Sequence, residues 1–241
     1  MKRSVFGTLL VITFMFGNAA GQLKRDTAAQ KPVVQTKESQ AKTTPHQALQ
    51  KLKEGNARFV SGTSHDHGSY RVEAPLTAKG QYPFAAFVSC IDSRVSVDDI
   101  FDLHNGDAFD ARVAGNIVDS DILGSLEYAT EEAGAKLIVV LGHTHCGGIK
   151  GACDDIKLGN LTGLVEKIKP AVTSVASGWH GGEMNSRNDK FVEAVMRENV
   201  RLTIRNIREQ SEVIHELEKK GKVEIVGAEY DVETGKVIFF E

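Results

Sequence analysis

Three residues in two short segments have the chemistry of a catalytic zinc site. Cys90 begins the segment Cys-Ile-Asp-Ser-Arg, and His143 and Cys146 bound the segment His-Thr-His-Cys. Zinc binds thiolates and imidazoles well, and catalytic zinc usually has three protein ligands and a fourth position open to water. The chain has three cysteines and no Cys-x-x-Cys pair that would complete a closed four-ligand cage. We therefore expect Cys90, His143 and Cys146 to hold one zinc ion.

Two charged residues follow the first ligand. Asp92 is close enough to Cys90 in sequence to accept a hydrogen bond from a water on the metal, or to bind the metal itself. A bidentate ion pair with Arg94 would hold the carboxylate ionised and turned away from the metal. Zinc lowers the pKa of a bound water toward about 7, so it supplies a hydroxide that attacks an electrophilic carbon. Because two thiolates donate more charge than two imidazoles, we expect activity to favour mildly alkaline pH.

The elements that position these residues are predicted from apolar runs. Residues 84–88 and 136–141 are short, apolar and rich in branched side chains, as buried parallel strands are. Each run ends at a ligand segment, and sites in open α/β sheets form beyond the carboxyl ends of strands. Residues 108–113 are predicted as another strand and residues 122–133 as a helix, which gives a βαβ order. Gly142, Gly147 and Gly148 would let the backbone approach the metal.

The rest of the chain completes an α/β pattern. Thr44, Pro45 and Gln47 form a helix start with a capping box. The helix that follows places Leu49, Leu52, Asn56 and Phe59 on one face, which should pack on a neighbour. Further helices are predicted over residues 161–168, 190–209 and 212–220, and a pair of strands over 223–230 and 236–240. The expected fold is a mostly parallel central sheet flanked by helices.

Four segments, taken in this order, resemble the β-class carbonic anhydrases. They are Cys90–Val95, Arg112–Asn116, Gly124–Ala129 and Gly142–Gly148, within a resemblance that covers residues 46–241. The resemblance implies zinc on Cys90, His143 and Cys146, with Asp92 as a fourth ligand in a closed state. It also implies a catalytic dyad of Asp92 and Arg94, the interconversion of carbon dioxide and bicarbonate, and an N-terminal helical arm that embraces a second subunit in a homodimer or homotetramer.

Other interpretations remain open at this point. A related enzyme could hydrolyse carbonyl sulfide or carbon disulfide at the same site, because both are linear electrophiles. A zinc-binding or bicarbonate-sensing protein without activity is a third possibility, although storage would not need Asp92 and Arg94. One subtype of the family holds an inhibitory bicarbonate with a tryptophan upstream of the first cysteine, whereas Trp179 is the only tryptophan here. Cys153 is expected to be a packed or half-exposed thiol, and His145 to point away from the metal.

The N-terminus has the layout of an export signal. Lys2 and Arg3 precede an apolar run over residues 5–16, and the small residues Ala19, Ala20 and Gly21 follow. We therefore predict a signal peptide over residues 1–21, a flexible polar spacer over 22–43, a catalytic domain over 44–241, and a periplasmic protein without a stable membrane anchor. The net charge of −3 gives no basic excess for nucleic acid.

Overall fold

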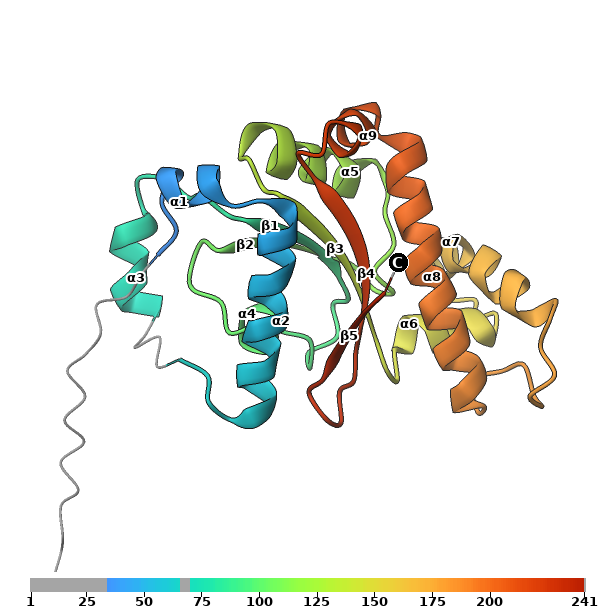
Figure 1. Ribbon diagram of the computed structural model, residues 1–241. Coiled ribbons are helices and arrows are strands. Elements are labelled where there is room, and N and C mark those ends of the chain that lie inside the picture. Colours follow the sequence, from blue (N-terminus) through green and yellow to red (C-terminus); the bar gives the residue numbers. More distant parts are fainter. Residues whose placement is uncertain (1–33, 66–69, 241) are drawn as a thin grey trace, which may run out of the picture. The chain divides into compact units, whose positions relative to one another are not determined.

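The structure is a computed structural model that describes residues 34–65 and 70–240. Its centre is a five-stranded sheet in the order β2-β1-β3-β4-β5 (Figure 1). Strands β1 (Ala85–Ser89), β2 (Ala108–Arg112), β3 (Leu137–His143) and β4 (Glu224–Tyr230) are parallel, and β5 (Val237–Phe240) is antiparallel to β4. The predicted mostly parallel α/β sheet is confirmed. The predicted signal peptide and residues 22–33 of the spacer lie outside the described residues.

Helices cover both faces of this sheet, because alternate side chains of a strand point to opposite sides. Phe87 and Leu137 pack toward α2 (Pro45–Ser61) and α4 (Val97–Ile100). Val88 and Ile138 pack on the other side. The helices that contribute to that second core are α5 (Ser120–Glu127) with its π-helical continuation η1 (Tyr128–Glu132), α6 (Gly147–Cys153), α7 (Gly159–Ala176), α8 (Asp189–Gln210) and α9 (Glu212–Lys219). Of the helices in residues 34–65 and 70–240, none combines the length and apolarity needed to cross a membrane.

The C-terminal part of the predicted flexible spacer forms a helix. Residues 37–42 form helix α1 (Lys37–Lys42), which begins with a capping box between Thr36 and Ser39. Gln40 is buried, and its side-chain amide donates to the carbonyl of Pro83 at 2.7 Å and to that of Ala133 at 2.7 Å. The expected flexible spacer is therefore a helix over this segment, because the Gln40 side chain holds it to backbone groups of the folded domain while its other polar side chains stay exposed.

Helix α2 begins as predicted, with Thr44 as the cap and Pro45 in the first turn. Its apolar face packs on the sheet of its own chain through Leu52. Asn56, on the same face, is buried: its amide nitrogen donates to the carbonyls of Ile100 at 3.1 Å and Gly235 at 2.9 Å, and its oxygen accepts from the Val237 amide at 2.9 Å. This single side chain therefore ties α2 to the turn between β4 and β5.

Other helices also differ from the expectation. The helix predicted to end at Ile168 continues through Pro170 to Ala176. A proline removes one helical hydrogen bond, and burial of Ile168 and Ala171 in the core holds the helix on both sides of it. Helices α3 (Tyr70–Thr77), α4 and α6 were not predicted from the sequence.

Candidate metal centre

The sheet brings the two ligand segments together at one edge. Cys90 directly follows β1, and His143 is the last residue of β3. Because β1 and β3 are parallel neighbours, with Val88 opposite Val140, their carboxyl ends meet at the same place. Cys146 lies beyond a tight turn, at the N-cap of α6. The large sequence separation of the ligands is thus bridged by one strand pairing.

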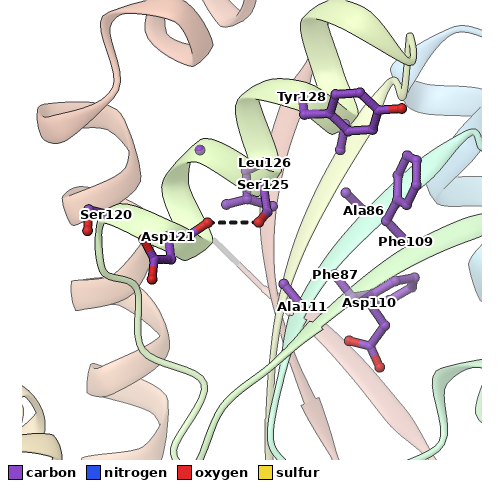
Figure 2. A pocket seen from close by; sticks show the side chains of 12 residues that line it. Ala86, Phe87, Phe109, Asp110, Ala111, Ser120, Asp121, Ser125, Leu126 and Tyr128 are labelled. Atoms are coloured by element: carbon purple, nitrogen blue, oxygen red, sulfur yellow. Dashed lines mark hydrogen bonds between the residues drawn. The ribbon is translucent and has the colours of Figure 1, made fainter.

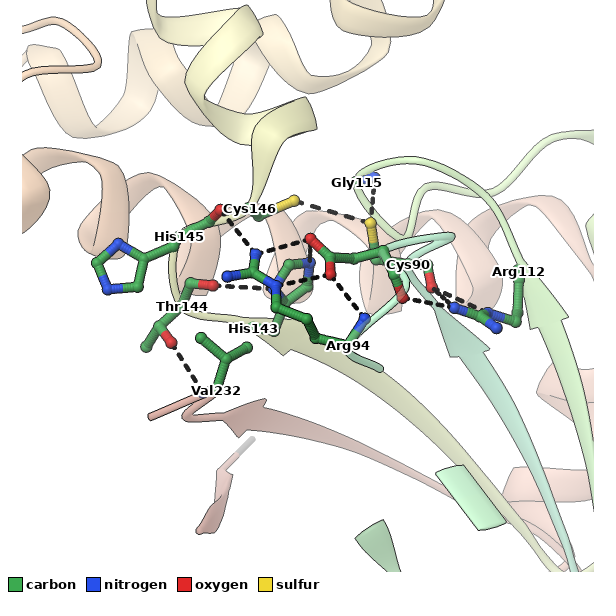
Figure 3. A network of polar contacts seen from close by, with 10 residues as sticks. Cys90, Arg94, Arg112, Gly115, His143, Thr144, His145, Cys146 and Val232 are labelled. Atoms are coloured by element: carbon green, nitrogen blue, oxygen red, sulfur yellow. Dashed lines mark hydrogen bonds and ion pairs between the residues drawn. The ribbon is translucent and has the colours of Figure 1, made fainter. Parts of the chain in front are cut away.

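The three side chains form a buried cluster that can hold a metal ion. Their ligand atoms all lie within 4.8 Å of one another, and the two sulfurs are 3.9 Å apart (Figure 3). Two thiolates at about 2.3 Å from a tetrahedral zinc would be about 3.8 Å apart. The His143 Nδ1–H donates to the carbonyl of Thr144 at 2.9 Å, so that Nε2 carries the lone pair. Among the described residues this buried Nε2 has no hydrogen-bond partner. The cluster therefore fits zinc.

The charge state of the cysteines favours a cation between them. The Cys146 thiol donates toward the Cys90 sulfur, which, with smaller contributions from His143 and the Gly115 amide, lowers the pKa of Cys90 to about 4. The same pairing, together with burial, raises the pKa of Cys146. Two buried thiolates at this distance repel each other, and a divalent cation removes that penalty. At neutral pH the pair therefore carries one proton, and a divalent cation could take its place.

Asp92 and Arg94 form the predicted bidentate ion pair. Arg94 Nε donates to Asp92 Oδ1 at 2.9 Å, Arg94 Nη2 to Oδ2 at 2.8 Å, and the Arg94 backbone amide to Oδ1 at 3.0 Å. The guanidinium holds the pKa of Asp92 well below its usual range, so the carboxylate is ionised. Asp92 Oδ2 is 3.9 Å from His143 Nε2. The carboxylate thus lies beside the metal cluster and is held by Arg94.

The other residues singled out from the sequence lie outside the cluster. His145 has a positive φ of 56° and points away, with Nε2 3.3 Å from Glu233 Oε1. Cys153 is a half-buried free thiol, as predicted. Gly142 has a different role from the expected one: a Cβ there would lie 2.4 Å from Met196 Sδ, so this glycine permits close packing of β3 on α8.

One supporting residue of the site was not identified from the sequence. Arg112, at the end of β2, donates from Nε and Nη2 to the carbonyl of Cys90, each at 3.0 Å, and from Nη2 to that of Asp92 at 2.7 Å. The guanidinium thus holds the backbone that carries both Cys90 and Asp92. Its place at the start of the family segment Arg112–Asn116 was the available signal, but its partners are backbone groups that the segment does not reveal.

Two pockets border the sheet. One of about 490 Å³ is bordered by Arg94, Ser93 and Tyr230, so it adjoins the dyad. The other, of about 580 Å³, lies between β2 and α5 and is lined by Phe109, Tyr128 and others, but by none of the cluster or dyad residues (Figure 2). The first pocket is therefore the one relevant to the chemistry of the dyad.

This arrangement defines a class of protein: an α/β domain with a Cys-His-Cys metal cluster beyond its parallel strands and an Asp–Arg pair beside it. The family model described as "Carbonic anhydrase" matches residues 85–237. Carbonic anhydrase 2 of Mycobacterium tuberculosis is 39% identical over 202 residues, covering 81% of this chain and 93% of that protein. The carbonic anhydrase of Mycolicibacterium smegmatis is 37% identical over 198 residues, with the same two coverages.

Solved structures agree with the sequence relatives. The β-carbonic anhydrase CcaA has a TM-score of 0.66 at 27% identity and covers 80% of this chain and 87% of its own. One of the tetrameric β-carbonic anhydrases from Sordaria macrospora has a TM-score of 0.63 at 25% identity, covering 81% of this chain and 95% of its own. This chain belongs to the β-carbonic anhydrase family.

Proposed function

We infer that this protein is a zinc-dependent carbonic anhydrase that interconverts carbon dioxide and water with bicarbonate and a proton. The observation that carries the inference is the buried Cys90–His143–Cys146 cluster with the ionised Asp92–Arg94 pair beside it, in a chain of this family. A site that only stores zinc has no use for the carboxylate and its guanidinium partner. Membership of the family favours carbon dioxide over carbonyl sulfide or carbon disulfide as the substrate.

Each residue of the site has a distinct role in the proposed reaction. Cys90, His143 and Cys146 would hold the zinc, which when bound acts as a Lewis acid that activates water near neutral pH. Asp92, kept ionised by Arg94, accepts a hydrogen bond from the attacking water and fixes its orientation. Arg94 keeps Asp92 off the metal, because both carboxylate oxygens are engaged by the guanidinium. Arg112 holds the Cys90–Asp92 backbone that joins the two parts of the site.

Stopped-flow measurement of carbon dioxide hydration tests this function directly. The purified, zinc-loaded protein is expected to accelerate acidification of a buffered indicator solution, and removal of the metal by a chelator should abolish the effect until zinc is restored. Carbonyl sulfide and carbon disulfide are assayed in parallel by release of hydrogen sulfide. Hydrolysis of these substrates without carbon dioxide hydration would replace the proposed activity with the related one.

We also propose that the chain assembles as a homodimer or homotetramer. In the part of the chain that the structure describes, no strand pairs with the outer edge of β2. The pocket between β2 and α5 opens beside this edge, and Tyr128 on its rim is 55% exposed. A tetrameric structural relative supports the same proposal. Light scattering during size-exclusion chromatography is expected to give two or four times the chain mass, and a monomer at all concentrations would contradict it.

The localisation proposal rests on the leader alone. Expressed in a Gram-negative host, the protein is expected in the periplasm with its N-terminus near Ala20–Gln22, because a basic start, an apolar run and small residues together direct export and cleavage. Fractionation followed by N-terminal sequencing checks this. A cytosolic protein that retains Met1 would overturn it.

A further inference from the structure

A loop between β2 and α5 lies directly over the Cys90 sulfur. The backbone amide of Gly115 in this loop donates to Cys90 Sγ at 3.4 Å, as Figure 3 shows. Gly115 has a φ of 72°, which a residue with a side chain rarely adopts. A Cβ there would also lie 2.6 Å from Ile168 Cδ1. Glycine at this position therefore lets the loop reach the sulfur without backbone strain.

The same loop is fixed from behind by helix α8. Asn199 Nδ2 donates to the carbonyl of Gly115 at 2.8 Å, and Thr203 Oγ1 donates to the carbonyl of Asn116 at 3.2 Å. Asn199 is 0% exposed and Thr203 is 2% exposed, one helical turn apart on the same face. One residue, Gly115, thus receives a hydrogen bond from α8 at its carbonyl and gives one to a metal ligand through its N–H.

We propose that Asn199 is a positioning residue of the metal centre, acting through Gly115 on the Cys90 thiolate. A hydrogen bond to a ligating sulfur draws charge away from it and fixes its direction, and such supporting contacts tune metal affinity. Asn199 holds the carbonyl of Gly115, the residue whose N–H makes this contact, although Asn199 touches neither metal nor substrate. The proposal rests on the function inferred above, because it requires a metal at the Cys90–His143–Cys146 cluster.

The position of Asn199 favours this role over plain packing. A buried amide is costly unless it is hydrogen-bonded, so a leucine of similar size would fill the same space in α8 at lower cost if packing alone mattered. The side-chain amide of Asn199 instead donates to the carbonyl of Gly115, the residue whose N–H contacts Cys90. Thr203 offers a matched comparison, since it is buried on the same helix and bonds to the next residue of the same loop.

The test compares Asn199→Leu and Asn199→Asp with Thr203→Val and the unaltered protein, each loaded with cobalt(II) or zinc. Both Asn199 variants are expected to bind zinc about 10–100-fold more weakly in competition with a chelator, and to shift the thiolate-to-cobalt charge-transfer band. Thr203→Val should lose thermal stability while keeping the zinc affinity and the band. Unchanged affinity and spectrum in folded Asn199 variants, or equal changes in Thr203→Val, would overturn the proposal.

A second measurement needs no variant at Asn199 and covers the case in which those variants do not fold. In the unaltered protein loaded with a magnetically active cadmium isotope, the Gly115 amide proton is expected to show scalar coupling to the metal through the Cys90 sulfur. Absence of that coupling in a cadmium-loaded sample would overturn the proposal. If the unaltered protein binds neither zinc, cobalt nor cadmium, the proposed metal-dependent function fails instead.

Discussion

Replacing any one of the three ligands, as Cys90→Ser, His143→Ala or Cys146→Ser, is expected to remove most of the bound zinc and to reduce carbon dioxide hydration to the level of the metal-free protein. The physical reason is that three protein ligands leave no redundancy. The three ligand atoms all lie within 4.8 Å of one another, and the Asp92 carboxylate, 3.9 Å from His143 Nε2, is the neighbouring group that could substitute. Metal analysis by mass spectrometry together with stopped-flow assay checks the prediction.

Cys153→Ser is the matched control for these variants. Cys153 is the third cysteine of the chain, half-buried and outside the cluster, and burial raises the pKa of its thiol to about 11. A neutral thiol of this kind is a poor ligand, so the variant should keep its zinc and its activity. Full zinc in Cys146→Ser, or loss of zinc in Cys153→Ser, would contradict the assignment of ligands.

The second large effect is expected at Asp92. Asp92→Asn keeps the size of the side chain but removes the charge that accepts from the attacking water and pairs with Arg94. We expect zinc to stay bound and transition-state stabilisation to fall by about 2–4 kcal/mol, the cost of one preorganised electrostatic contact. This corresponds to a decrease of about 30- to 1000-fold in kcat/KM. The water on zinc ionises between about pH 7 and 9. If Asp92→Asn with zinc bound hydrates carbon dioxide at the wild-type rate in this range, the dyad mechanism is ruled out.

Arg94→Ala should lower the activity by a different route, and a double variant separates the two. Without its guanidinium partner, Asp92 is free to turn toward the metal, since its Oδ2 is already 3.9 Å from His143 Nε2. In the double variant Asp92→Asn/Arg94→Ala, no carboxylate is present to occupy the metal. The double variant should therefore lose less activity than the sum of the two single losses. Strict additivity of the two losses would show that Asp92 does not displace water in the Arg94 variant.

Much of the site was predictable because its signals are local in the sequence. Cysteine, histidine, aspartate and arginine at short fixed spacings identify the chemistry, and apolar runs before Cys90 and His143 identify buried parallel strands. Parallel strands bring their carboxyl ends to one edge, so the cluster of Cys90, His143 and Cys146 followed from the strand assignment. The start of α2 was equally local, because Thr44, Pro45 and Gln47 cap a helix with their own backbone.

The tertiary structure decided the contacts made between side chains and distant backbone. Gln40, Arg112 and Asn199 each donate to carbonyl groups, and a carbonyl is the same in every residue, so no sequence pattern identifies the acceptor. The continuation of α7 through Pro170 depends on core packing that outweighs one missing hydrogen bond. The sequence by itself therefore determined which side chains form the cluster and which edge of the sheet carries them. How firmly those side chains are held depends on the packing of helix α8 and strand β2 around them, which arises only when the chain is folded.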